Sequence, residues 1–112
     1  MGNDIDGLAS NTLGRKKLDP EQIAGELNAL GARWSVAGPD IQLTLAVKPM
    51  VKAVEVAAAA AKLADEMDHH PRIVIEYQGI TLSIHTHDAS GITMMDLVYA
   101  ARLERWLREK GL

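Results

Sequence analysis

The sequence predicts an α+β domain in which helices back a four-stranded antiparallel sheet. Two observations lead to this prediction. Helical and strand patterns follow one another in the order helix, two strands, helix, two strands, helix. Within each strand pair only a few turn residues separate the two strands, so the strands of a pair must run antiparallel.

The first helix is predicted to begin at Asp19. This residue can cap the helix, Pro20 is favoured in its first turn, and Gln22 is spaced to complete a capping box. Apolar residues then recur on one face until Gly31, which ends the helix. The two strands that follow flank a Gly-Pro-Asp turn and are expected at residues 33–36 and 41–47.

Residues 1–17 combine Gly, Asn, Asp and Ser without a sustained apolar period. They are expected to form a flexible N-terminal leader, and residues 18–112 to form the domain. No apolar run of signal-peptide type and no uncharged stretch of transmembrane length occurs, so we expect a cytoplasmic protein without a membrane partner.

A long helix is predicted over residues 49–68. Its charged residues Lys48, Lys52, Glu55, Lys62 and Glu66 recur at helical spacing in one narrow stripe, and almost everything else in it is apolar. In so small a protein the sheet can cover only one side of this helix. We therefore expect the other side to meet a second copy of the chain, in a homodimer or homotetramer.

The second strand pair is predicted at residues 72–77 and 80–87, joined at Gln78-Gly79. In the later strand, alternation places His85 and His87 on the face opposite the apolar residues. Thr93 then caps the last helix, which runs to about residue 110 and has Asp96 at its third position.

Composition limits the possible functions. The 12 Lys and Arg residues against 15 Asp and Glu residues give a net charge of -3, which argues against nucleic acid as the main partner. The chain has no cysteine, so disulfides, thiolate catalysis and cysteine-based zinc sites are excluded.

All four histidines lie between positions 69 and 87. The unperturbed pKa of histidine is close to neutral pH, so such a cluster is typical of proton transfer or metal binding. The run from Asp65 to Asp96 resembles the signature of the pterin-4a-carbinolamine dehydratases, also known as dimerization cofactors. That family has an acidic residue, His-His-Pro, an aromatic residue, a further histidine and an aspartate, and the matching positions are Asp65, His69, His70, Pro71, Tyr77, His87 and Asp96.

The resemblance implies an activity and roles for individual residues. The activity is dehydration of a 4a-hydroxytetrahydropterin to a quinonoid dihydropterin in pterin recycling, with no cofactor and no metal. His70 and His87 would be the acid–base groups and His69 would position the pterin, while Asp96 would orient a histidine or keep it protonated. The predicted order of helices and strands is also that of the family's fold.

Further candidate residues surround this signature. Asp65 stands where the family usually has glutamate, and Trp34 resembles the tryptophan that would form a wall beside the pterin ring. The family usually has no histidine at the position of His85, so its effect on the reaction is expected to be mild. The full set of candidate substrate-binding residues is Asp65, Trp34, Asp68, His85, Thr86 and Asp88.

Three alternatives stay open. His69 and His70 are well placed simply to interact with the C-terminal dipole of the long helix. His85 and His87, with one of that pair, would supply the three imidazoles of a catalytic zinc site. The third alternative is an inactive scaffold or dimerisation partner with the dehydratase fold. Ile73 favours it by replacing a tryptophan usual in the family, as does the absence of phenylalanine.

Overall fold

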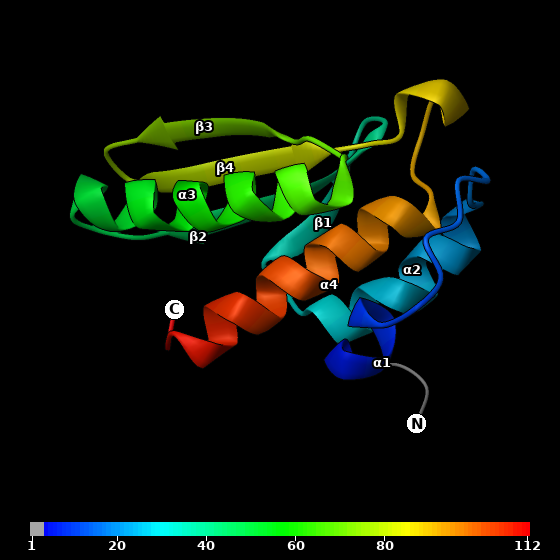
Figure 1. Cartoon of the computed structure of the whole chain (residues 1–112), viewed down its shortest axis with the longest axis horizontal. Helices are drawn as coiled ribbons and strands as arrows, with labels where there is room; N and C mark the ends of the chain where they lie inside the picture. The colour runs from blue at the N-terminus through cyan, green and yellow to red at the C-terminus, as the bar shows by residue number, and fades with distance from the viewer. Residues whose placement is uncertain (1–3) are drawn as a thin grey trace.

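The computed structural model describes residues 4–112, which form four α-helices and one four-stranded antiparallel sheet (Figure 1). This confirms the predicted fold class and the order of its elements. The helices are α1 (Ile5–Ala9), α2 (Pro20–Leu30), α3 (Met50–Met67) and α4 (Met94–Glu109). The strands are β1 (Trp34–Ala37), β2 (Asp40–Ala46), β3 (Arg72–Glu76) and β4 (Gly79–Ile84), and a short 3₁₀ turn, η1 (His87–Ala89), precedes α4.

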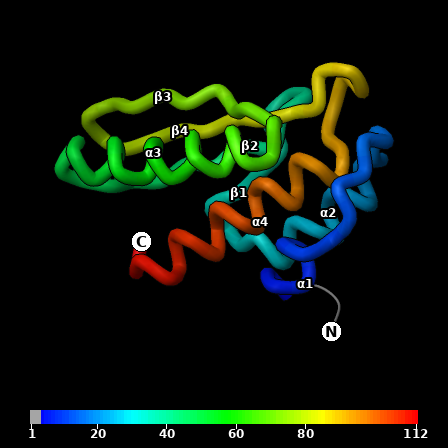
Figure 2. The backbone as a smooth tube through the Cα atoms, in the orientation of Figure 1, coloured from blue at the N-terminus to red at the C-terminus, as the bar shows by residue number. Residues whose placement is uncertain are grey.

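The two central strands of the sheet are β2 and β4, because the strand order is β1-β2-β4-β3. Their register pairs Ile41 with Ile84 and Leu45 with Ile80, so their apolar side chains lie on the same face. Helices pack on this face, and Figure 2 shows α3 running alongside β3 and β4. The buried residues contributed by β2 and β4 are Ile41, Leu43, Leu45, Ile80, Leu82 and Ile84.

Both predicted helix caps are present. Asp19 Oδ1 accepts the backbone N–H of Gln22, and the Gln22 side chain accepts the backbone N–H of Asp19. Thr93 and Asp96 form the same reciprocal arrangement at the start of α4. Gly31, with a φ of +93°, ends α2 as predicted.

The last strand is shorter than predicted, because β4 ends at Ile84 rather than at residue 87. The neighbouring strands also end here: β2 begins at Asp40, one residue before Ile41, the partner of Ile84, and β3 begins at Arg72, the partner of Ser83. The chain therefore leaves the sheet. His87 lies in η1 and does not share a strand face with His85.

The turn between β3 and β4 also differs by one residue. Glu76 pairs with Gly79, so the turn consists of Tyr77 and Gln78 rather than Gln78 and Gly79. Gly79 has a φ of +153°, and a Cβ atom there would lie 2.0 Å from the carbonyl oxygen of Leu45. Glycine is required because β2 passes this close.

Residues 4–17, the part of the expected leader that the structure describes, contain one short helix, and residues 1–3 lie outside the described residues. Helix α1 is capped by Asp4, and its Leu8 and Ala9 are buried against α4. Arg102 of α4 donates a hydrogen bond from Nε to the carbonyl oxygen of Ala9 over 2.9 Å. A helix of five residues is too short to show a helical period, which is why the sequence pattern did not reveal it.

Among residues 4–112, only one side of α3 is buried. The buried side faces the sheet and α4 and consists of Ala53, Val56, Ala60, Ala64 and Met67. The opposite side carries exposed apolar residues, of which Val51 is 68% exposed and Val54 is 50% exposed. No helix within residues 4–112 is long and apolar enough to cross a membrane.

Helix α4 is joined to the first hairpin by a buried carboxylate. Glu104, which is 2% exposed, accepts two hydrogen bonds from Arg33, one from the Trp34 indole N–H and one from Arg108, over 2.8–2.9 Å. Burial by itself raises the pKa of a carboxyl group. The hydrogen bonds from Arg33, Trp34 and Arg108 and the charge of Arg33 outweigh it and hold the pKa of Glu104 below its usual value.

We expect Glu104→Gln to lower the free energy of unfolding by about 3 kcal/mol at pH 7, because it removes the charge shared by two arginines. The pKa of Glu104 is lower in the folded state, so this stabilisation is complete above the unfolded carboxyl pKa of about 4.3 and declines as the pH falls below it. Urea denaturation of both proteins at pH 7 and pH 3.5 measures the difference.

The matched control is Glu55→Gln, at an exposed position of α3, which should change the stability by less than about 0.5 kcal/mol. An equal stability gap between wild type and Glu104→Gln at the two pH values would contradict this account of the network.

Candidate active site

The end of α3 turns the two adjacent histidines in different directions. Asp68 adopts a left-handed conformation with φ 50° and ψ 47°, and the backbone N–H of His69 donates to the carbonyl oxygen of Ala64 over 3.0 Å. Pro71 then disfavours further helix. As a result, His69 is buried and His70 is exposed.

His69 and Asp96 form a buried pair. Their exposed fractions are 8% and 0%, and His69 Nε2 lies 2.5 Å from Asp96 Oδ1. An ionised carboxylate can only accept, so the shared proton belongs to Nε2 of the imidazole. Nδ1 of His69 has no hydrogen-bond partner in residues 4–112. Every buried polar side-chain atom among these residues has a partner, so Nδ1 is not fully buried and keeps access to solvent.

The other oxygen of Asp96 is also fully used. Oδ2 accepts the backbone N–H of Thr93 and the hydroxyl of Thr86, each over 2.8 Å. Thr86 is 0% exposed, and its hydroxyl also lies 2.7 Å from that of Thr93. Thr86 therefore stabilises Asp96 by a hydrogen bond, and its buried hydroxyl is not open to a substrate in this structure.

His70 pairs with the first acidic residue of the signature. Its Nε2 lies 3.0 Å from Asp65 Oδ1, and both side chains are exposed at the surface. Water screens such a pair, so it orients the imidazole without holding it tightly.

His85 has a carboxylate partner that the sequence analysis did not identify. Its Nδ1 lies 2.7 Å from Oδ1 of Asp40, the first residue of β2. Ile41 pairs with Ile84, so the next position along places Asp40 opposite His85 across the two strands. The signal was therefore the register between β2 and β4, which one sequence does not reveal.

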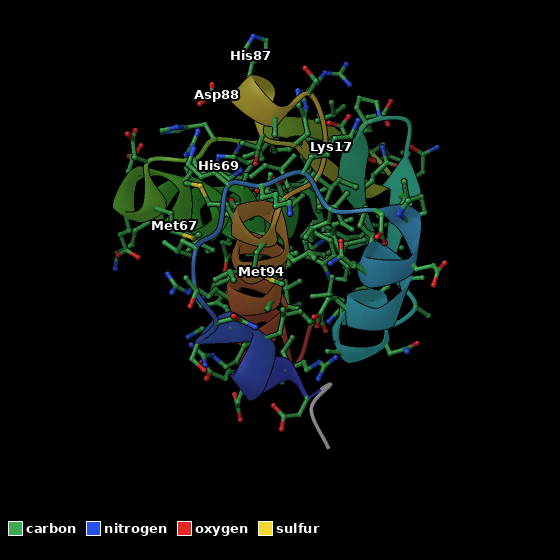
Figure 3. The ribbon with its side chains drawn as sticks, turned by 90° about the vertical axis from the view of Figure 1, so that its right-hand side faces the viewer. Lys17, Met67, His69, His87, Asp88 and Met94 are labelled. Atoms are coloured by element: carbon green, nitrogen blue, oxygen red, sulfur yellow. The ribbon has the colours of Figure 1, made fainter. Side chains whose placement is uncertain are left out.

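His87 is exposed in η1 and projects away from the body of the protein, while His69 lies lower, toward the start of α4 (Figure 3). The ring centre of His87 is 6.2 Å from that of His85. The next residue, Asp88, forms an ion pair with Arg15 over 2.8 Å. The N-terminal segment thus contacts the loop that carries His87.

A cleft of about 400 Å³ brings three of the four histidines together. It is lined by Asp40, His70, Pro71, Arg72, Ser83, Ile84, His85 and His87. His69 does not line the cleft, although it directly precedes His70 in the chain and its partner Asp96 is bonded to Thr86, the residue before His87. These groups suit proton transfer, because two of the imidazoles have carboxylate partners: Asp40, which lines the cleft, pairs with His85, and Asp65, outside the lining, pairs with His70.

Several other candidate residues lie outside this cleft. Trp34 is buried, and its indole N–H is bonded to Glu104. Tyr77 is exposed at the far end of β3, where the Lys48 ammonium lies 4.5 Å from its ring centre. Asp68 is exposed at the end of α3. Among residues 4–112 no three His, Asp or Glu side chains are grouped so that they could hold a metal ion, so the geometry gives the zinc alternative no support.

We expect Asp96→Asn to switch the tautomer of His69. The amide oxygen can still accept from Thr86 and Thr93, and the amide N–H₂ then faces His69 Nε2, which must become an acceptor. The change should cost about 1–3 kcal/mol of stability. Long-range ¹H–¹⁵N spectra of the imidazole and urea denaturation measure both effects.

Asp88→Asn is the matched control. Asp88 forms a surface ion pair with Arg15, so this substitution should change the stability by less than about 1 kcal/mol. Unchanged His69 ring signals in Asp96→Asn would show that the buried pair is not formed as described.

Comparisons with a family model and with individual proteins indicate the same family. The family model described as pterin 4 alpha carbinolamine dehydratase matches residues 16–106. A Sulfurisphaera tokodaii protein named "Putative pterin-4-alpha-carbinolamine dehydratase" is 35% identical over 92 residues, which cover 82% of this chain and 98% of that protein. A protein of the same name from Acidobacterium capsulatum is 34% identical, over 81% of this chain and 98% of its own length.

A solved structure supports the same assignment. The crystal structure of a protein named transcriptional coactivator/pterin dehydratase, from Brucella melitensis, superposes with a TM-score of 0.74 at 25% identity, covering 80% of this chain and 97% of the other. The segment matched by the family model, residues 16–106, contains α2, the whole sheet, α3, the cleft and most of α4. The chain belongs to the pterin-4a-carbinolamine dehydratase family.

Proposed function

We propose that the protein dehydrates 4a-hydroxytetrahydropterin to quinonoid dihydropterin, in cytoplasmic pterin recycling. The observation that supports this most directly is the convergence of His70, His85 and His87 on one cleft, next to the buried His69–Asp96 pair. In the reaction the C4a–O bond breaks and a proton goes to the departing hydroxyl, which leaves as water. N5 loses its proton and the C4a–N5 double bond forms, so protons balance and no electrons are exchanged.

The proposed roles follow the family signature. His70 and His87 transfer the two protons, because both line the cleft and both reach solvent. His69 positions the pterin through Nδ1, and Asp96 fixes the tautomer that leaves Nδ1 without a proton. Asp65 orients His70.

A non-catalytic role is the second candidate. The Brucella melitensis protein is named a transcriptional coactivator as well as a dehydratase. In this chain Ile73 stands where the family usually has a tryptophan, and its side chain packs against the core and does not line the cleft. Absence of dehydratase activity would favour the scaffold.

We expect His70→Ala and His87→Ala each to reduce turnover by about 10²-fold or more, because each removes a proton-transfer group. A spectrophotometric assay with authentic 4a-hydroxytetrahydropterin measures the rate. Lys52→Ala, at an exposed position of α3, is the control and should retain wild-type turnover. Circular dichroism checks that each variant is folded, and wild-type activity no greater than that of buffer would exclude the proposed reaction.

We also propose that α3 associates with a second copy of the chain. Met50, Val51 and Val54 form an exposed apolar patch on the helix, and small alanines at positions 58 and 61 allow another helix to approach closely. Burying this patch against its own copy removes apolar surface from water.

Val51→Glu combined with Val54→Glu should therefore convert the oligomer into a monomer, because it places charges in the contact. Sedimentation equilibrium at micromolar concentration gives the mass, and Lys52→Ala again serves as the control. A wild-type protein that is monomeric under these conditions would contradict the proposed assembly.

A further inference from the structure

The cleft contains one more oriented imidazole than the two proton transfers require. His70 and His87 take the proposed acid–base roles, and His85 lines the same cleft. The family signature does not include His85, and Asp40 has no role in it. Asp40 and His85 nevertheless form the shorter of the two imidazole–carboxylate pairs that line or border the cleft, at 2.7 Å against 3.0 Å for His70 and Asp65.

The backbone holds this pair in place. Asp40 is the first residue of β2, after a two-residue turn whose Gly38 has a φ of +60°. The register of β2 with β4, in which Ile41 faces Ile84, brings Asp40 beside His85. The two side chains are 27% and 35% exposed, so the pair is less open to water than that of His70 and Asp65, at 57% and 81%.

The hydrogen bond selects one form of the neutral ring. A carboxylate accepts, so His85 donates from Nδ1 and its Nε2 becomes an acceptor. Nε2 has no hydrogen-bond partner among residues 4–112, and the ring borders the cleft. The arrangement therefore presents a hydrogen-bond acceptor of fixed direction to whatever occupies the cleft.

We propose that Asp40 is a positioning residue that fixes His85 as a substrate-binding acceptor, which receives a hydrogen bond from an N–H group of the pterin. The inference rests on the proposed function and adds a recognition role to it. Proton transfer remains with His70 and His87, so loss of His85 should weaken substrate binding more than it slows the chemical step.

Steady-state kinetics and imidazole spectra of four variants test the proposal. His85→Ala and Asp40→Ala should each raise KM about tenfold, as the loss of one hydrogen bond to a bound ligand does, with less than a threefold change in kcat. The double variant should be no worse than His85→Ala, because Asp40 acts only through His85. Asp40→Asn should retain near-wild-type KM, because its amide oxygen can still accept from Nδ1.

The His85 tautomer is read from long-range ¹H–¹⁵N spectra. The wild type and Asp40→Asn should hold the proton on Nδ1, whereas Asp40→Ala should show a mixture of the two tautomers. Thr44→Ala, on the same strand at an exposed position, is the control and should match the wild type in every measurement. A merely structural role for Asp40 would leave the tautomer and the rescue by asparagine unexplained.

Titration with 7,8-dihydrobiopterin separates the failure of this inference from failure of the proposed reaction. Active enzyme with wild-type KM in His85→Ala would overturn the inference and leave the reaction standing. Inactive wild type that binds the pterin about tenfold more tightly than His85→Ala would do the reverse. Wild type with neither activity nor pterin binding would overturn both.

Discussion

The candidate active site depends on one buried carboxylate, that of Asp96. Its two oxygens join three separate parts of the chain: the end of α3 through His69, the loop after β4 through Thr86, and the start of α4 through the backbone of Thr93. A buried carboxylate is stable only when its acceptor sites are filled, and here an imidazole, a hydroxyl and a backbone N–H fill them. The hydrogen bonds that Asp96 accepts therefore fix the direction of the His69 ring and hold Thr86, the residue before η1, against the start of α4.

Helix α4 carries a second buried carboxylate, Glu104, two turns further along. The two carboxylates connect α4 to different parts of the domain. Glu104 binds Arg33 and Trp34 of the first hairpin, while Asp96 binds the site. The hairpin is thereby fixed to α4 at the residues where it begins, and its far end places Asp40 next to His85. Burial raises the pKa of Tyr99, which lies between these two carboxylates along α4, and its hydroxyl donates to the carbonyl oxygen of Ala60 in α3.

The four histidines of the candidate site differ in exposure. His69 is enclosed beside the cleft, His85 is held by Asp40 where the two central strands end, and His70 and His87 extend toward solvent from a helix end and a short turn. This distribution fits the proposed roles, because a binding group benefits from fixed geometry and a proton-transfer group must exchange its proton with water. The N-terminal segment adds support to the exposed part through the Arg15–Asp88 ion pair, although residues before position 16 lie outside the family match.

The sequence by itself determined the fold class, both helix caps and the candidate histidines, because these depend on local spacing. It also pointed to Asp96, since the signature and the helix cap coincide there. Tertiary structure alone decided that Trp34 binds Glu104 in the core, that Thr86 supports Asp96, and that Asp40 reaches His85. Each of these contacts joins residues on different elements, and its formation depends on strand register and helix packing, which no local pattern encodes.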